Sequence, residues 1–326
     1  MSEPPADPRT TGDPEIARKW LLAFQKAHPD IVAATPPKGQ IRGIDAYARP
    51  ELLHQVVAQA LEIHRRRHGR WPMPHRLERT ADCFFADKFF GAYPIDPNPA
   101  DKLNAAVWLP EPLSGLVRVA ERPWVADAPG LPPDDSVPPG RWILKLGLGN
   151  ATNEWIDWPP SAKERARLDA LTSEWFQGRY GVRWGEWWYA IGKQRLFLEQ
   201  DLTEARAGRP EFKLFTRGGR VVMIRAILHR KAQGLPNGER FYDAAFRPIK
   251  GQSVGYAPMA SPPPASAERM LEAAAGIGRH FNRMRVDFLD TGDERPWLNE
   301  LTIGDVNARR IMTPDLDCSF RRLMFE

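Results

Sequence analysis

The spacing of apolar residues changes along the chain, from a helical period near the N-terminus to alternation in the second half. Apolar residues recur every three or four positions after Pro14 and Pro50, which predicts two amphipathic helices. Ser161 and Ser266 precede two further helical stripes. Alternating or continuous apolar runs predict strands at 142–146, 187–191, 195–199, 211–217 and 220–228. This order of elements favours an α+β fold with mostly antiparallel sheets and flanking helices.

Proline-rich, irregular sequence separates the two halves. Residues 1–13 are polar and rich in proline, so we expect a disordered tail. Residues 71–139 show no sustained period, and their last part, 129–139, is typical of a linker or surface loop. We therefore expect a helical or mixed N-terminal domain over 14–140 and a second domain over 141–326.

The last predicted hairpin brings two acidic residues together. Alternating runs at 285–288 and 298–302 flank a turn at 293–294, and folding about that turn sets Asp287 opposite Glu300. Opposed Cβ atoms lie roughly 4.5–5.5 Å apart, where like charges destabilise a sheet. A shared cation relieves that repulsion, and hard oxygen ligands suit Mg²⁺. The alternative is a solvent-facing hairpin with hydrated acids, and a register slip of one residue would separate them.

Composition narrows the classes of ligand and location. Lys and Arg outnumber Asp and Glu by 46 to 41. This small excess suits an anionic ligand but is too diffuse to indicate nucleic acid. The two cysteines, Cys83 and Cys318, form no CxxC pattern, so we expect free thiols and a cytoplasmic location. No apolar run approaches the ~20 residues of a membrane span.

Candidate phosphate-binding residues follow the first strand of the second half. The sequence has no complete dinucleotide fingerprint, no P-loop and no kinase HRD and DFG pair. Lys145 nevertheless ends a strand just before Gly147 and Gly149, where backbone N–H groups and a lysine charge would approach a phosphate. A solvated lysine at a strand end is the alternative. The strand at 195–202 ends in polar residues, which is typical of a nucleobase slot or of an ordinary strand end.

Six short motifs follow one another in order along the chain. They are Asp101-Lys102-Leu103, Ile143-Leu144-Lys145, Leu198-Glu199-x-x-Leu202, Glu211-Phe212-Lys213, Arg285-x-Asp287 and Asn299-Glu300-x-Thr302. This series resembles the ATP-grasp superfamily, which includes D-alanine–D-alanine ligase. Segments 185–189, 211–215, 285–288 and 299–302 resemble its teichuronopeptide-biosynthesis (TupA-like) branch. The resemblance covers roughly residues 98–310 and implies an ATP-grasp fold, with the nucleotide held between two subdomains.

The resemblance also implies a set of site residues. Those that would hold the ATP phosphates are Lys102 and Lys145 with the glycines Gly147 and Gly149. Glu199, Gln200 and Leu202 would form the adenine hinge. Glu211 would bind the ribose. Asp287 and Glu300 would bind Mg²⁺. Arg285 and Lys145 would act on the transferring phosphoryl group.

The chain departs from the family pattern around the metal. Thr302 stands where these ligases usually place a metal-binding Asn, and Asp305 or Asn307 is a candidate to replace it. The usual His-Gly-Ser-Gly type of loop is replaced by residues 147–150. These differences leave the second metal and the acceptor specificity open.

The resemblance implies an ATP-dependent carboxylate–amine ligase that forms an acyl phosphate and releases ADP. Its partners would be a small carboxylate and an amine, with acidic sugars and amino acids as candidates, in cell-surface polysaccharide or peptide-conjugate synthesis. Mg²⁺, Lys145 and Arg285 would neutralise the charge that gathers at the γ-phosphate. Two alternatives remain: a glycosyltransferase or phosphotransferase that uses the same cleft, and a non-catalytic nucleotide-binding protein.

Overall fold

The computed structural model describes residues 12–150, 152–178, 181, 185–305 and 308–326. Its α-helices are α1 (Pro14–Ala27), α2 (Pro29–Ala33), α3 (Pro50–His68), α4 (Thr80–Phe90), α5 (Ala162–Gln177), α6 (Ala267–Gly278) and α7 (Pro314–Phe325). Its 3₁₀ helices are η1 (Gly43–Ala46), η2 (Lys102–Trp108), η3 (Glu111–Leu116), η4 (Asp134–Ser136), η6 (Trp187–Tyr189) and η7 (Lys231–Gln233). Its strands are β1 (Gln40–Arg42), β2 (Ala92–Pro94), β3 (Trp124–Ala126), β4 (Gly140–Leu146), β5 (Asn153–Trp158), β6 (Leu196–Gln200), β7 (Glu211–Arg217), β8 (Arg220–Leu228), β9 (Gly238–Tyr242), β10 (Ala257–Pro258), β11 (Arg283–Leu289) and β12 (Trp297–Thr302).

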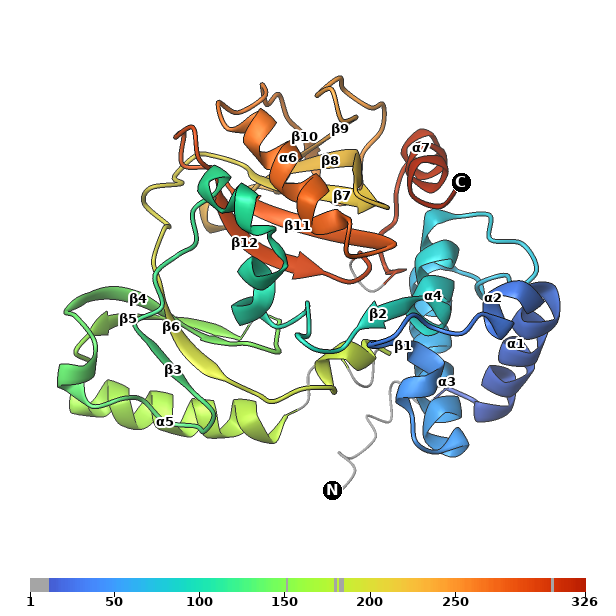
Figure 1. Cartoon of the computed structure of the whole chain (residues 1–326), viewed down its shortest axis with the longest axis horizontal. Coiled ribbons are helices and arrows are strands. Elements are labelled where there is room, and N and C mark those ends of the chain that lie inside the picture. The colour runs from blue at the N-terminus through green and yellow to red at the C-terminus, as the bar shows by residue number, and fades with distance from the viewer. Residues whose placement is uncertain (1–11, 151, 179–180, 182–184, 306–307) are drawn as a thin grey trace.

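A six-stranded sheet forms the upper half of the molecule in Figure 1, in the order β10-β9-β8-β7-β11-β12. Its pairs are antiparallel except for the short parallel pair of β9 and β10. Leu214 and Val286 lie on the face that packs against Met270 and Ile277 of α6. Because side chains alternate along a strand, the residues between them lie on the other face. That second face carries most of the charged residues considered below.

A four-stranded antiparallel sheet, β3-β6-β4-β5, lies below the first and is covered by α5 (Figure 1). Leu144 and Leu198 share a core with Leu168 of α5. Lys145 and Glu199 alternate with those two leucines, so they lie on the face away from α5. The segment with η2 packs on β12, between the two sheets.

The helices near the N-terminus gather at one side of the six-stranded sheet (Figure 1). Asp13 caps α1 by accepting a hydrogen bond from the Glu15 N–H at 2.9 Å. Phe24 of α1 belongs to the same core as Phe241 of β9 and Phe320 of α7. Part of the expected N-terminal domain also enters the four-stranded sheet, because β3 pairs with β6. The expected boundary at residue 140 therefore stays a prediction, and the expected disordered tail lies almost wholly outside the described residues.

The α+β prediction and the antiparallel sheets are confirmed, as are the strands at 142–146, 195–199, 211–217 and 220–228. The strand predicted at 187–191 is wrong: its core is the 3₁₀ helix η6, in which Trp187 and Trp188 are buried edge to face. A short aromatic run has no period that distinguishes a strand from a buried helical turn.

Helix α4 was not expected, because 71–139 looked irregular. Every residue of α4 is buried, so the helix has no polar face and leaves no amphipathic period in the sequence. Cys83 of α4 is buried and Cys318 of α7 is exposed, and both are free thiols, as expected. Among the described helices, none has both the length and the apolar character that a membrane-spanning helix requires.

Candidate functional site

Charged residues lie side by side across four strands of the six-stranded sheet. In register, Arg225 of β8 stands next to Lys213 of β7, Lys213 next to Asp287 of β11, and Asp287 next to Glu300 of β12. The predicted opposition of Asp287 and Glu300 is thus confirmed. The register shifts between Phe288 and Asp287, on the turn side of the pair, where Asn299 is the extra residue of β12; Asp287 therefore stands opposite Glu300 because of this irregularity.

Asp287 lies at the centre of this row and is fully buried. Its Oδ1 accepts from Arg285 Nε at 2.7 Å, and its Oδ2 accepts from Arg285 Nη2 at 2.7 Å and from Lys213 Nζ at 2.5 Å. Two cations therefore compensate one carboxylate, which is what a buried charge requires. Burial would lower the pKa of the Arg285 guanidinium, but Asp287 more than offsets it and the pKa is raised.

Glu300 is more accessible, with 29% of its side chain exposed, and Arg285 Nη2 lies 3.4 Å from its Oε1. Desolvation raises the pKa of Glu300, and the neighbouring charge of Asp287 raises it further. The two carboxylates repel each other, and a divalent cation between them would relieve that repulsion.

The donor set fits a Mg²⁺ ion that a nucleotide helps to bind. Among the described residues, no three or more His, Cys, Asp or Glu side chains are grouped as a metal site. Mg²⁺ is usually bound through one or two carboxylates with substrate phosphates and water completing the octahedron. Asp287 and Glu300 supply that number of carboxylates, and an ion at Asp287 would have to replace Arg285 or Lys213, which now donate to both of its oxygens.

Asp305 is engaged elsewhere. Arg310 donates to its carboxylate from Nε at 2.5 Å and from Nη2 at 2.9 Å, and Arg285 donates from Nη1 at 3.2 Å. Burial alone would raise the pKa of Asp305, but Arg310 and Arg285 reverse the effect and hold it well below its usual range. These bonds favour a role in fixing Arg285. Thr302 is the Cα partner of Arg285, and Asn307 lies outside the described residues.

The four-stranded sheet contributes a second group of charges. Lys145 Nζ donates to Glu199 Oε1, and Arg122 Nε donates to Glu199 Oε2 at 3.0 Å. Burial would raise the pKa of Glu199, but Lys145 and Arg122 together lower it. The Gln200 N–H donates to the Glu121 carbonyl at 2.9 Å. The expected adenine hinge therefore has its carboxylate and one backbone donor already paired.

Lys102 lies between the two groups. Its Nζ donates to the Gly149 carbonyl and lies 3.5 Å from the Leu146 carbonyl. Burial lowers the pKa of this ammonium, and the negative charge of Glu300 on β12 opposes that effect. Lys145 and Glu199 of the other sheet also act on it. Lys102 thus interacts both with residues expected to bind the phosphates and with a residue expected to bind the metal.

The glycine loop is anchored to the rest of the protein. A Cβ on Gly147 would lie 2.5 Å from Asp101 Oδ1, and one on Gly149 would lie 2.3 Å from Thr152 Oγ1. Leu148 between them is buried, and its carbonyl accepts from Gln194 Nε2 at 3.1 Å. Close packing within the protein accounts for both glycines.

Glu211 is held by Lys213, which belongs to the same sequence motif, and by His229. Lys213 Nζ donates to its Oε1 at 2.7 Å, and His229 Nε2 lies 3.1 Å from its Oε2. Burial would raise the pKa of Glu211, but Lys213 and His229 lower it strongly. The alternation Glu211-x-Lys213 shows that both lie on one face. Their proximity to Asp287 depends on the pairing of β7 with β11, which no local signal reveals.

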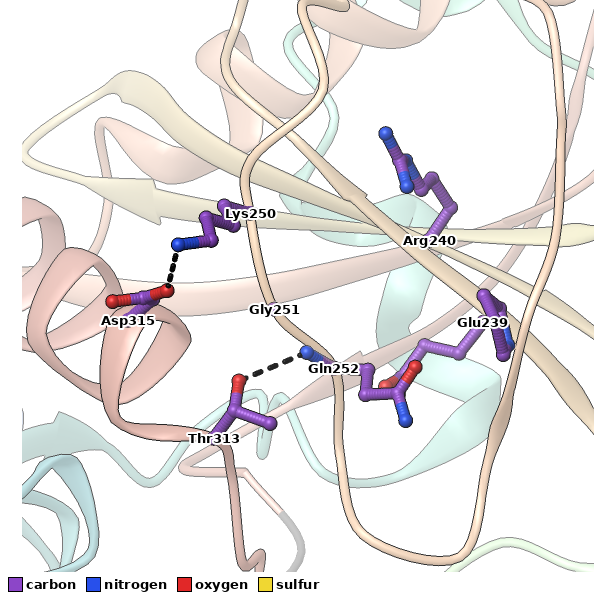
Figure 2. Close-up of a pocket in the computed structure, with 8 residues that line it drawn as sticks. Glu239, Arg240, Lys250, Gly251, Gln252, Thr313 and Asp315 are labelled. Carbon is purple, nitrogen blue, oxygen red and sulfur yellow. Dashed lines mark hydrogen bonds and ion pairs between the residues drawn. The ribbon is translucent and has the colours of Figure 1, made fainter.

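Leu202, the last expected hinge residue, is buried, and its carbonyl accepts from the Arg206 N–H at 3.1 Å. A cavity of about 290 Å³ lies away from the expected site, beside the start of α7 (Figure 2). Lys250 and Asp315 form an ion pair of 2.8 Å at its edge, and Thr313 Oγ1 accepts from the Gln252 N–H at 3.1 Å.

No protein-family model and no curated protein matches this chain. Similar solved structures include D-alanine–D-alanine ligase from Bacillus anthracis, at 12% identity and a TM-score of 0.41, covering 70% of this chain and 64% of that chain. The ATP-grasp ligase PsnB complexed with minimal precursor is 14% identical, with a TM-score of 0.33. The match covers 65% of this chain and 53% of that chain. An L-amino acid ligase from Bacillus licheniformis is 15% identical, with a TM-score of 0.35. The match covers 70% of this chain and 48% of that chain. This chain thus spans about half to two-thirds of their lengths, and similarity at this level does not place it in a family.

Proposed function

We propose that this protein has an ATP-grasp fold and is an ATP-dependent ligase that joins a carboxylate to an amine through an acyl phosphate. The observation that carries the proposal is that charged residues of the six-stranded sheet interact with charged residues of the four-stranded sheet. Asp287 and Glu300 oppose each other on one sheet with Arg285 bonded to both, and Lys102 lies within the electrostatic reach of Glu300 and of Lys145 on the other sheet. Paired carboxylates with several fixed cations suit the transfer of a highly charged phosphoryl group.

Asp287 and Glu300 would hold Mg²⁺, which when bound neutralises the β- and γ-phosphate oxygens of ATP. Arg285 remains charged at any physiological pH and already touches both acids, so it would stabilise charge on the transferring phosphoryl group. Asp305 would fix the position of Arg285 by its bond of 3.2 Å.

Lys145 would exchange partners during the reaction. It is paired with Glu199, and an incoming phosphate would compete with that carboxylate for the ammonium. Lys102 is held by backbone carbonyls and so would keep its position. Glu211 would accept ribose hydroxyls, because a carboxylate fixed by Lys213 and His229 stays charged and retains acceptor capacity.

The finer assignment rests on the sequence motifs. Their resemblance to the TupA-like branch supports a role in cell-surface polysaccharide or peptide-conjugate synthesis in the cytoplasm, with an acidic sugar or amino acid among the substrates. A fold and a phosphate-binding site do not fix the substrate, so the substrate is identified by offering the protein a panel of acids and amines.

The test is ADP formation from Mg-ATP with a panel of uronic acids and amino acids, each run with hydroxylamine in place of the amine. An acyl phosphate is captured by hydroxylamine as a hydroxamate, which is measured by mass. Glu300→Gln provides the matched inactive control, because it keeps the shape and removes the charge. Turnover of a sugar nucleotide without ATP would instead establish a glycosyltransferase and overturn the proposal.

A further inference from the structure

A second cavity, of about 250 Å³, lies beside the loop that follows β12. Three arginines, Arg67, Arg309 and Arg310, line it together with Ser253 and Tyr256, and the other lining residues are apolar. Among the described residues that line it, none is acidic. A cavity with three guanidinium groups, a hydroxyl and a phenol has the lining of an oxyanion site.

Arg310 and Arg67 reach the cavity from different parts of the fold, and hydrogen bonds hold both of them. Arg310 is buried; besides its bonds to Asp305, its Nη1 lies 3.1 Å from Ser253 Oγ and 3.3 Å from Glu239 Oε1. Arg67, in the last turn of α3, donates from Nε to the Arg309 carbonyl at 3.0 Å. The surrounding loops are joined by the Val254 N–H, which donates to the Ile311 carbonyl at 2.9 Å. The lining is therefore preformed.

One residue next to this lining, Ala308, has an unfavourable backbone conformation. Ala308 has a φ of 58°, in the left-handed region that residues with a Cβ seldom adopt. Its carbonyl is the partner of His68 Nε2 at 2.8 Å, so α3 holds this residue as well as the Arg309 carbonyl. A strained conformation persists where its surroundings impose it, and such positions are typical of functional sites.

Two of the three arginines in the cavity have carboxylates near them: Arg309 interacts electrostatically with Glu186, and Arg310 is bonded to Asp305 and Glu239. Asp305 and Glu239 balance Arg310 from behind, and neither lines the cavity; Glu239 lines the other cavity instead (Figure 2). Arg67 is exposed and, among the described residues, has no carboxylate at ion-pair distance; its bond is to a backbone carbonyl. An anion bound between Arg67 and Arg310 would supply the missing charge.

The cavity is linked to the proposed ligation site. Asp305 bonds to Arg310 on the cavity side and to Arg285 on the other, and Arg285 bonds to Asp287. From this continuity we propose that the cavity binds an oxyanion group of a substrate, a carboxylate or a phosphate that the reaction leaves intact. The proposal rests on the proposed function for its assignment to a substrate. The binding site itself is independent of catalysis.

The sharpest test uses Val254, which lines the cavity and is 58% exposed, so that substitution does not disturb the core. Val254→Glu places a carboxylate beside the arginines, and Val254→Gln is the control of equal size without charge. Arg67→Gln removes one guanidinium, and Arg322→Gln, an exposed arginine in the last turn of α7 that does not line the cavity, controls for the lost charge.

Binding of L-glutamate, D-glucuronate and inorganic phosphate is measured calorimetrically with each protein in the absence of ATP. Val254→Glu and Arg67→Gln should each weaken binding of the preferred anion by on the order of tenfold or more, as the loss of a charged hydrogen bond predicts, and the two controls should not. Preference for phosphate over the two carboxylates would identify a phosphate-bearing substrate.

The two proposals fail separately. Anion binding that is absent, or that is equally strong in all four variants, overturns the cavity site whether or not ADP is formed. Charge-sensitive binding without ADP formation from any acid and amine leaves the site standing and counts against the ligase. If ligation occurs, Arg67→Gln should raise the KM of the anionic substrate and leave the KM of ATP unchanged.

Discussion

Replacing Asp305 with asparagine should lower the free energy of unfolding by about 3 kcal/mol. The carboxylate is 2% exposed and accepts from Arg310 at 2.5 and 2.9 Å and from Arg285 at 3.2 Å. Removing one partner of a buried ion pair costs about 3–5 kcal/mol, because the remaining charge stays desolvated. The lower end applies because Glu239 still lies 3.3 Å from Arg310 and Asp287 still binds Arg285.

Denaturant-induced unfolding, followed by the fluorescence of the 12 tryptophans and by circular dichroism, measures this loss. Asp134→Asn is the matched control: it removes the same charge from an ion pair with Arg165 in which the aspartate side chain is 60% exposed. Exposed pairs contribute about 0–1 kcal/mol, so the control should unfold nearly as the parent protein does.

A second substitution tests the cause. In Asp305→Asn/Arg310→Met the guanidinium that lost its anion is gone, so the double variant should lose less stability than the sum of the two single variants. If Asp305→Asn unfolds at the same denaturant concentration as Asp134→Asn, Asp305 does not compensate Arg310 and the reasoning is refuted.

Three further predictions concern nucleotide, turnover and pH. Mg-ATP at ~100 times its dissociation constant should add about 2.7 kcal/mol to stability, read as a rise in melting temperature, and ATP with chelator should add much less; equal protection would contradict the metal site. Lys145→Ala should chiefly weaken nucleotide binding, whereas Glu300→Gln should lower the rate of ADP release by on the order of 10²-fold; normal turnover in the second variant would contradict the role given to the carboxylate pair. Burial, and to a smaller extent the charge of His64, lowers the pKa of His68 from 6.5 to about 4. Between pH 6.5 and 4 the unfolded chain therefore binds a proton that the folded protein does not, and the free energy of unfolding falls as the pH drops through this range. The other charged groups acting on His68 are Asp82 and Arg79. His68→Gln should remove about 1–2 kcal/mol of that loss, after discounting for partial exposure, and an unchanged pH profile of unfolding would exclude the effect.

Local signals in the sequence were sufficient for the existence of the hairpin, and the predicted pair of Asp287 and Glu300 is present. The register next to the turn, Phe288 with Leu298, would by itself set Asp287 opposite Asn299, and the irregularity that brings Glu300 there was not predicted. The roles given to these and the other site residues stay predictions.

The pairing of strands that are distant along the chain could not be predicted from the sequence. Lys213 stands next to Asp287 only because β7 lies beside β11, and these strands are separated by some 70 residues along the chain. The same holds for Arg310 and Arg67, which line one cavity although more than 240 residues separate them along the chain. Helix α4 was missed for a different reason, since complete burial removes the polar face that periodicity needs.

The alternation of faces in β7 and β11 has a consequence for how the protein can vary. Leu214 and Val286 anchor α6 while Lys213 and Asp287 carry the charges, so point substitutions on one face leave the other undisturbed. The insertion or deletion of a single residue inside either strand would exchange the faces, sending charge into the core and leucine into the site. Natural length variation should therefore be confined to connections such as 229–237, and a shuffled library that crosses over within these strands should yield few folded proteins.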